Sequence, residues 1–242
     1  MTFTSGGSGN PVVVTVTSAN GVCAVNGTTI SYLKAGSCLL DLDQAGNADY
    51  AAAFTTNLIL AVGKGSQAIL GLFLPPAPRV GDSVVLAASG GASGQPVTYA
   101  SSSSACTVSG SSVSFVHVGL CSVTASQAGT ADYAAASDVT VSTTVAKKLQ
   151  SISFSLPSAP KVGTSAVLSA TASSGGAVSY VAGGGAGVCR IVGSSVVYDH
   201  AGTCTVTASQ AGSDDVAAAP EVSQTVVVGK GLQSISFVLP GP

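Results

Sequence analysis

The chain contains no tryptophan, one methionine, two histidines and few charged side chains. Only 7% of the 242 residues are charged, and the formal net charge is −2. The charges are scattered, so the basic stripe of a nucleic-acid-binding protein is absent. No apolar run approaches the roughly 20 residues of a membrane-spanning helix. The opening MTFTSGGSGNPVVV lacks the basic start and leucine-rich core of a signal peptide. We therefore expect no nucleic-acid partner and no membrane insertion.

Catalytic patterns are also missing. The sequence contains no G-x-S-x-G elbow and no recurring Ser-His-Asp order. His117 and His200 occupy one repeated position, where Lys34 stands in the first copy. A catalytic or metal-binding role would not tolerate that exchange, so we interpret the position as a solvated loop. We expect no enzyme activity, no catalytic residue and no cofactor.

The residues that are plentiful favour β-structure. Hydrophobic residues make up 46% of the chain, and Gly (30) and Pro (10) interrupt it often. Val and Thr are abundant, and their branched side chains pack well on a pleated surface. Short strands separated by frequent turns are typical of an all-β fold.

A repeat of 83 residues organises the chain. Cysteines recur at this spacing in two sets, Cys23/Cys106/Cys189 and Cys38/Cys121/Cys204. The segments QAGNADY (44–50), QAGTADY (127–133) and QAGSDDV (210–216) keep the same period, and LQSISF occurs at 149–154 and at 232–237. The period predicts a first repeat at 1–64 that lacks its first strand, complete repeats at 65–147 and 148–230, and an orphan first strand at 231–242.

One repeat has the length and pattern of a small β-sandwich. From Leu149 onward we predict seven short strands, in QSISFSL, AVLSATAS, VSYVA, CRIVG, SVVYD, TCTVTAS and VSQTVVV. The order of these motifs, with A-G-T-C-T-V-T-A and Q-x-x-x-V-G-K-G, resembles the bacterial Ig-like tandem repeats of large surface and secreted adhesin-type proteins. The resemblance covers the whole chain. It implies immunoglobulin-like sandwiches, an extracellular or cell-surface setting and a stalk or adhesive role, with a host or cell-surface ligand as a further partner.

Each repeat contains two cysteines that are 15 residues apart. Since the repeats must fold alike, we expect disulfides within the repeats, Cys23–Cys38, Cys106–Cys121 and Cys189–Cys204. Without tryptophan, the pair is not the bridge between the sheets of antibody domains, and we expect it to tie a strand end to a later strand at a corner. Two cysteines with no matching His pair make a poor zinc site. Disulfides indicate an oxidising compartment.

Other recurring polar residues are interpreted structurally. Asp49, Asp132 and Asp215 recur near a Gly turn, where Asp side chains satisfy backbone groups. Asp41 and Asp43 lie near Asp49, but the other repeats carry Thr or Ser in their place, so we expect no metal site. The junction lysines are interpreted as charges that keep strand edges soluble (Lys64, Lys147, Lys230).

The two ends of the chain are complementary. Residues 1–64 lack about 20 residues, including the first strand, whereas 231–242 form a first strand with no domain after it. Ile235, Phe237 and Leu239 lie on one face of this strand. Twelve residues reach at most about 40 Å, and three domains in a row span roughly 100 Å, so we expect the strand to fill another copy. The hypothesis is a head-to-tail filament formed by donor-strand complementation. The alternatives are a stalk or spacer fragment of a bacterial adhesin and a phage or virion surface module.

Overall fold

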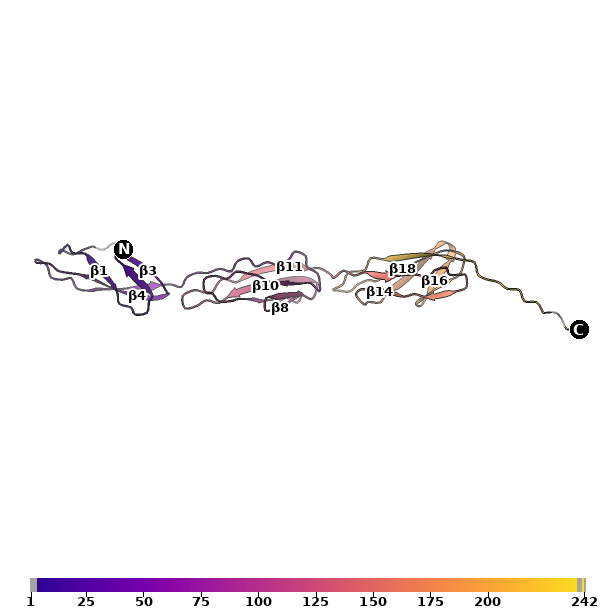
Figure 1. The fold of residues 1–242 in the computed structure, drawn as a ribbon, viewed down its shortest axis with the longest axis horizontal. Coiled ribbons are helices and arrows are strands. Elements are labelled where there is room, and N and C mark those ends of the chain that lie inside the picture. Colours follow the sequence, from indigo (N-terminus) through magenta and orange to yellow (C-terminus); the bar gives the residue numbers. More distant parts are fainter. Residues whose placement is uncertain (1–3, 239–240, 242) are drawn as a thin grey trace. The chain divides into compact units, whose positions relative to one another are not determined.

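The computed structural model describes residues 4–238 and 241. Apart from one 3-10 turn, Gly185–Gly187 (η1), every regular element in this part of the chain is a strand (Figure 1). The expected all-β class is confirmed. The chain divides into two compact units, one comprising Met1–Pro76, Ser83–Ser114 and Cys121–Thr143 and the other comprising Ala77–Asp82, Phe115–Leu120 and Thr144–Pro242. The repeat boundaries remain predictions.

The second unit contains the third repeat. Its strands are β12 (Ile152–Phe154), β13 (Ser165–Val167), β14 (Ala170–Ala172), β15 (Ser179–Gly184), β16 (Cys189–Val192), β17 (Ser195–Tyr198), β18 (Gly202–Ser209) and β19 (Val222–Val228). One layer consists of the two-stranded sheet β12-β14 and the three-stranded sheet β13-β17-β16. The other layer is the three-stranded sheet β15-β18-β19. These orders match the ABED and CFG sheets of an immunoglobulin constant-type sandwich. The expected immunoglobulin-like fold is confirmed.

The prediction of seven strands was wrong in one place. The segment AVLSATAS is divided into two strands, because β13 pairs with β17 whereas β14 pairs with β12. Leu168, between the two strands, is buried. The B strand of the sandwich therefore changes partner half-way along its length.

Alternation of apolar and polar residues builds the core of this repeat. Along β18, Cys204, Val206 and Ala208 are fully buried. The threonines between them face outward, where Thr205 and Thr207 make hydrogen bonds of 3.2 and 2.8 Å with hydroxyls of β19. This pattern of period two is what a strand with one buried face requires.

The first unit contains the first repeat and most of the second. The second repeat has strands β6 (Ser83–Val85), β7 (Val97–Ala100), β8 (Cys106–Ser109), β9 (Ser112–Phe115), β10 (Gly119–Gln127) and β11 (Val139–Val145). They form the sheets β6-β9-β8 and β11-β10-β7. A bridge between Leu70 and Ser89 stands where β12 and β14 pair in the third repeat.

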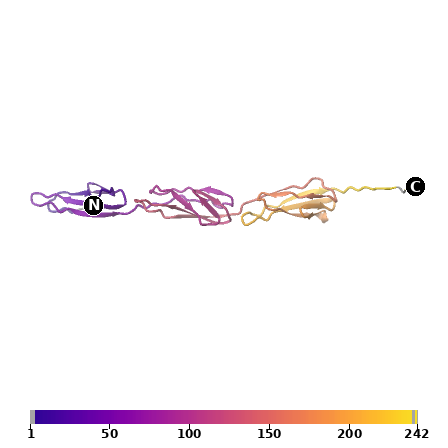
Figure 2. The same ribbon diagram turned by 90° about the horizontal axis from the view of Figure 1, so that it is seen from below.

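The first repeat has fewer strands. They are β1 (Val12–Val16), β2 (Cys23–Asn26), β3 (Thr29–Tyr32), β4 (Gly36–Gln44) and β5 (Thr56–Val62). The strands of this repeat run along its long dimension (Figure 2). The sheet β1-β4-β5 is complete, but the opposite layer, among the described residues, is only the β2-β3 hairpin. The counterparts of β12 and β13 are absent from this layer.

Candidate functional site

The three disulfides join the two layers of each sandwich. Cys23–Cys38 links β2 to β4, Cys106–Cys121 links β8 to β10, and Cys189–Cys204 links β16 to β18, with Cα–Cα distances of 5.7, 5.5 and 5.7 Å. The expectation of a corner tie was therefore wrong, because the partners lie in opposite sheets. The bridge starts from strand D and not from strand B, which distinguishes it from the antibody bridge.

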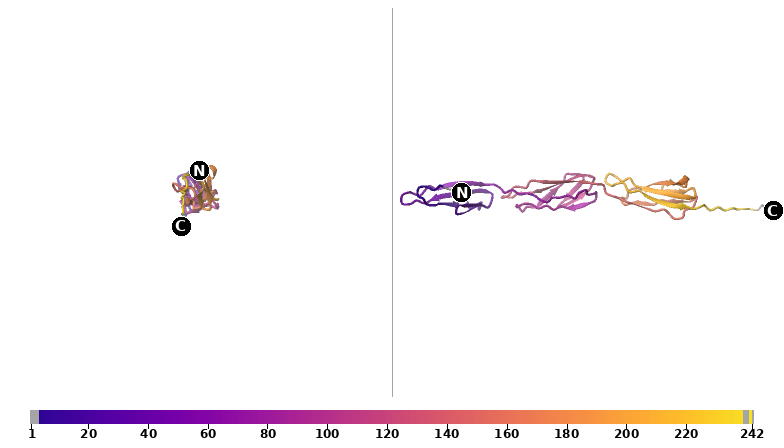
Figure 3. Two further views of the ribbon diagram at one scale, coloured as in Figure 1. Left: turned by 90° about the vertical axis from the view of Figure 1, so that its right-hand side faces the viewer. Right: turned by 90° about the horizontal axis from the view of Figure 1, so that it is seen from above.

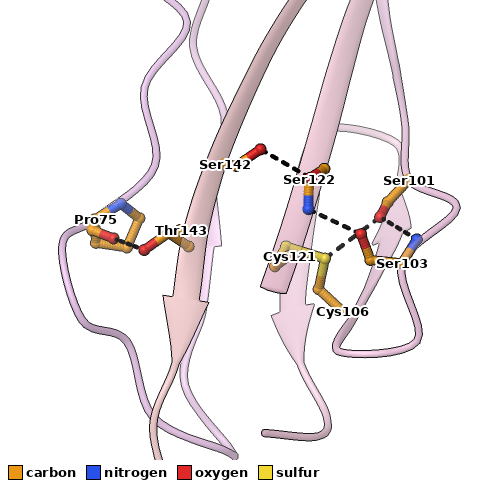
Figure 4. The surroundings of a disulfide bond; sticks show 8 residues. All are labelled: Pro75, Ser101, Ser103, Cys106, Cys121, Ser122, Ser142 and Thr143. Carbon is orange, nitrogen blue, oxygen red and sulfur yellow. Dashed lines mark hydrogen bonds between the residues drawn. A yellow bond between two sulfur atoms is a disulfide. The ribbon is translucent and has the colours of Figure 1, made fainter. Parts of the chain in front are cut away.

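Serine side chains surround the disulfide of the second repeat (Figure 4). Ser101 Oγ lies 3.4 Å from Cys106 Sγ, and Ser103 Oγ accepts a hydrogen bond of 2.9 Å from the Ser122 backbone N–H. Both cysteines of this bridge are buried. These contacts fix the loop before β8 to strand β10, so the bridge and its serines are a structural element.

The tail residues of the predicted self-assembly set lie in solvent. Residues 231–238 form no strand (Figure 3, right). Ile235 and Phe237 are 98% and 79% exposed, whereas their counterparts Ile152 and Phe154 in β12 are 9% and 7% exposed. Leu239, the third residue of the set, lies outside the described residues. The role of all three in assembly remains a prediction.

The first repeat contains an open pocket of about 410 Å³. Val12, Leu42, Gln44, Ala53 and Phe54 are among the residues that line it. The Phe54 side chain is 99% exposed. The pocket lies between the edge strand β1 and the loop after β4.

The same place is filled in the second and third repeats. Ala125 and Ala136, the counterparts of Leu42 and Ala53, are buried and cluster with Ile69. In the third repeat Ile152 belongs to the buried core. The pocket of the first repeat is thus the position of the first-strand isoleucine.

A second apolar position of the first repeat, that of Tyr32, is also exposed to solvent. Tyr32 is 57% exposed, whereas the residues at the same position of the other repeats, Phe115 and Tyr198, are each 1% exposed. In the third repeat, the backbone N–H of Tyr198 donates to Thr164 in the turn before β13, and that of Gly163 donates to Tyr198. The first repeat has no such turn among its described residues, which is why Tyr32 is uncovered.

A first-strand glutamine is a further site residue that the sequence interpretation missed. Gln67 Nε2 donates to the carbonyls of Ala128 (3.1 Å) and Ala134 (2.8 Å). Gln150, which is buried, donates to the carbonyl of Ala217 at 2.6 Å. These bonds tie the start of the first strand to the loop after the F strand.

In the first repeat the corresponding carbonyl has a serine donor, as Ala128 has in Ser93, and an asparagine donor in place of the glutamine. The carbonyl of Ala45, the counterpart of Ala128, accepts hydrogen bonds of 3.0 Å from Ser8 Oγ and of 3.0 Å from Asn10 Nδ2. The tail carries Gln233 at the position of Gln67. The recurrence of this glutamine with the 83-residue period is the signal that would have identified it.

The repeats are joined by a recurring polar contact. In the first unit, Asp132 Oδ1 accepts a hydrogen bond of 2.9 Å from the backbone N–H of Ala35, and Lys64 Nζ donates to the carbonyl of Thr130 at 2.7 Å. The backbone N–H of Gly65 donates to the carbonyl of Asp132 at 2.8 Å. The loop 128–134 thus contacts Ala35 and Lys64 of the preceding repeat and Gly65 at the start of its own.

The second unit repeats this contact. Asp215 accepts hydrogen bonds from the backbone N–H of Val118 (2.9 Å) and from His117 Nδ1 (2.8 Å). Lys147 Nζ donates to the carbonyl of Ser213 at 2.6 Å. The interpretation of the aspartates as caps of their own turn was therefore wrong, whereas His117 and the two lysines are exposed, as expected of solvated residues. Their partners lie in the adjacent repeat, which no local pattern reveals.

These bonds favour the ionised form of Asp215. The hydrogen bond from His117, then the one from the backbone of Val118, holds the pKa of Asp215 below its ordinary value of 3.8. The carboxylate therefore stays charged in mildly acidic solution and keeps both hydrogen bonds there.

The aspartates of the first repeat are engaged elsewhere. Asp43 Oδ1 accepts a hydrogen bond from Thr55 Oγ1 (2.5 Å), and Asp41 Oδ1 accepts one from Asn57 Nδ2 (2.6 Å). Within residues 4–238 and 241 no three His, Cys, Asp or Glu side chains gather as metal ligands would. Asp41 thus acts as a cross-strand partner of β5, and Asp43 binds the residue just before this strand.

Comparison with known proteins gives structural likeness alone. No family model and no curated protein matches the sequence. Solved structures that resemble the chain include Drosophila N-cadherin EC1-4 (13% identity, 95% of this chain and 69% of that one, TM-score 0.28). The insect immune protein hemolin (10%, 92% and 68%, 0.35) and surface layer protein SbsC, domains 1-6 (15%, 94% and 36%, 0.31) are others. At these identities and TM-scores the likeness carries no argument about what the chain binds.

Two observations bear on location. None of the described helices is long and apolar enough to cross a membrane. All six cysteines form disulfides, and such bonds persist in oxidising compartments outside the cytosol.

Proposed function

We propose that the chain is an extracellular structural protein whose copies assemble head to tail, with residues 232–240 of one copy completing the first repeat of the next. One observation carries the proposal. The pocket of about 410 Å³ in the first repeat is the place that Ile69 and Ile152 fill in the other repeats. The segment LQSISF, which fills it in the third repeat, recurs at 232–237.

The apolar surface on the two sides supports this match. Ile235 and Phe237 are exposed in the tail, and their counterparts are buried. Fully burying one such side chain contributes about 1.5–3 kcal/mol. Gln233 would donate to the carbonyl of Ala45 beside Ser8, as Gln67 donates beside Ser93 to the carbonyl of Ala128. The donor segment therefore supplies an apolar face and a polar anchor together.

The pairing of the donor strand follows from equivalent hydrogen bonds. Gly6 N donates to Gln44 Oε1 at 2.8 Å, and Gly91 N donates to Gln127 Oε1 at 2.7 Å. Gly6 thus corresponds to Gly91.

Two residues earlier, Thr4 corresponds to Ser89, which exchanges backbone hydrogen bonds of 2.9 and 2.8 Å with Leu70. The counterpart of Leu70 in the tail is Ser236. Donor Ser236 should therefore pair with Thr4 of the recipient in an antiparallel register. Repetition of this heterologous contact gives an open filament.

Electron microscopy of the full, oxidised chain tests the proposal, with a variant lacking residues 232–242 as the control. We expect wild-type fibres with one repeating unit per chain, and single particles of the truncated variant. Sedimentation velocity should show the same difference. Fibres that persist after truncation, or a wild-type chain that stays monomeric at high concentration, would contradict the proposal.

A second function is favoured by one observation. The donor segment supplies strand A but no counterpart of β13, so Tyr32 would stay exposed in the filament. In a stalk or spacer segment of a longer surface adhesin, preceding residues of the same polypeptide would supply both strands. Chemical nitration distinguishes the two: Tyr32 stays reactive in the donor-strand filament and is protected in the longer polypeptide.

A further inference from the structure

The loop 44–53 of the first repeat has the same backbone hydrogen bonds as the loops that form the two internal junctions. Asn47 N donates to the carbonyl of Tyr50 at 2.8 Å, as Thr130 N does to Tyr133 (2.8 Å). The end of the loop is closed by the same bond in the first repeat, from Ala53 N to Gln44 (3.0 Å), as in the others. The loop therefore has the conformation of the two junction loops.

Its aspartate nevertheless has no partner. Asp132 and Asp215 are half-buried against the preceding repeat, whereas Asp49 is exposed. Among the described residues the Asp49 carboxylate makes no hydrogen bond, and only its backbone N–H is engaged, with Asn47 Oδ1 at 2.8 Å. Tyr50, the next residue, is 54% exposed.

The complementary groups at the other end of the chain are exposed in the described structure. His200 and Ala201 occupy the positions of His117 and Val118, and both are exposed. Backbone hydrogen bonds hold their turn, because Asp199 N and His200 N donate to the carbonyl of Val188 at 2.9 and 3.2 Å. In the first repeat Leu33 N and Lys34 N donate to the carbonyl of Val22 at 2.8 and 3.2 Å. The turn thus has the conformation that binds aspartate in the first junction.

We propose that Asp49 of one copy accepts hydrogen bonds from the Ala201 backbone N–H and the His200 side chain of another copy, while Lys230 donates to the carbonyl of Asn47. This inference rests on the proposed function and adds a polar clamp to its donor strand. The occupant is a second copy, because both internal junctions use the same groups.

The clamp and the donor strand are continuous along the chain. At the internal junctions Gly65 and Lys148, the first residues of their repeats, exchange backbone hydrogen bonds of 2.8–2.9 Å with the junction loop of the same repeat. Gly231 holds the same position. From there the chain enters the first-strand position at Gln233. The clamp therefore sets where the donor strand begins.

The internal junctions also indicate which groups of the proposed clamp contribute most. Lys34 replaces His in the first junction, where Asp132 still binds the backbone N–H of Ala35. The carboxylate and the N–H are thus the common pair, and the imidazole is an addition. Removing Asp49 should weaken assembly more than removing His200.

The test is the critical concentration for fibre formation of the full chain, measured by sedimentation. We expect Asp49→Ala to raise it about tenfold, since a hydrogen bond to a charged group contributes about 1.4 kcal/mol or more. His200→Ala should raise the critical concentration only about threefold, because an exposed contact between charged side chains contributes less. Asp41→Asn, which removes a charge from the same repeat away from the loop, should leave it unchanged.

The critical concentration of the double variant Asp49→Ala/His200→Ala should exceed that of Asp49→Ala by less than about threefold. The two effects are not additive, because the two groups share one contact. Circular dichroism should show that the variants fold, since the Asp49 side chain is exposed. Unchanged assembly of Asp49→Ala, in a chain whose fibres vanish on truncation of the tail, would overturn the clamp and leave the donor strand standing. Fibres that survive truncation would overturn both.

Discussion

Replacing one donor side chain tests the energetics of the filament. Ile235 is 98% exposed in the tail, and Ile152 is 9% exposed in its strand. Burial of isoleucine contributes about 1.5–3 kcal/mol. Since 1.4 kcal/mol is a factor of ten, Ile235→Ser should raise the critical concentration about 10- to 100-fold. Sedimentation of fibres over a dilution series measures this quantity.

Val238 supplies the matched control. Its counterpart in the third repeat is Ser155, on the exposed face of the first strand. Val238→Ser should therefore change the critical concentration less than about twofold, as surface substitutions usually do. If the two variants weaken assembly equally, the tail acts through general hydrophobicity. The proposed strand register would then be refuted.

Three further predictions concern folding. The hydroxyl of Tyr198 is buried without a partner among the described residues, its burial raises its pKa, and Phe115 stands at the same position of the second repeat. Tyr198→Phe should therefore raise the unfolding free energy by about 1 kcal/mol, as chemical denaturation would measure; a loss of stability would contradict this. Replacing Cys106 and Cys121 by Ala opens a loop of 15 residues and should cost about 3 kcal/mol, seen by calorimetry as a lower melting temperature of one transition; an unchanged scan would refute it. Because the folded-state pKa of Asp215 is lowered, its contribution to the junction is complete above pH of about 4 and is lost as pH falls through that pKa. The amide proton shift of residue 118 should follow this titration, and a flat response would argue against the contact.

The sequence period and strand alternation predicted the sandwich and the cysteine pairs. These features depend on local residues or on recurrence, both of which are visible in one chain. Val206 and Ala208 alternate with Thr, for example, and their burial follows directly. The division of the B strand was not predictable, because β13 and β14 differ only in which distant strand they pair with.

The junction contacts were misinterpreted for a related reason. The recurrence of Asp132 and Asp215 was evident, but a turn aspartate and an aspartate that binds another repeat give the same local pattern. The partners of Asp215 are 97 and 98 residues away. Only the placement of one repeat's loop beside the turn of the previous repeat distinguishes the two.

A disulfide between copies tests donor-strand assembly most directly. Residues that exchange both backbone hydrogen bonds across an antiparallel pair lie about 5.5 Å apart at Cα, within the range of a disulfide. The chain with Thr4→Cys and Ser236→Cys should form a ladder of covalent oligomers on a non-reducing gel. Thr4→Cys with Val238→Cys, displaced by roughly 7 Å along the strand, should not. A ladder from both variants, or from neither, would contradict head-to-tail assembly through this strand.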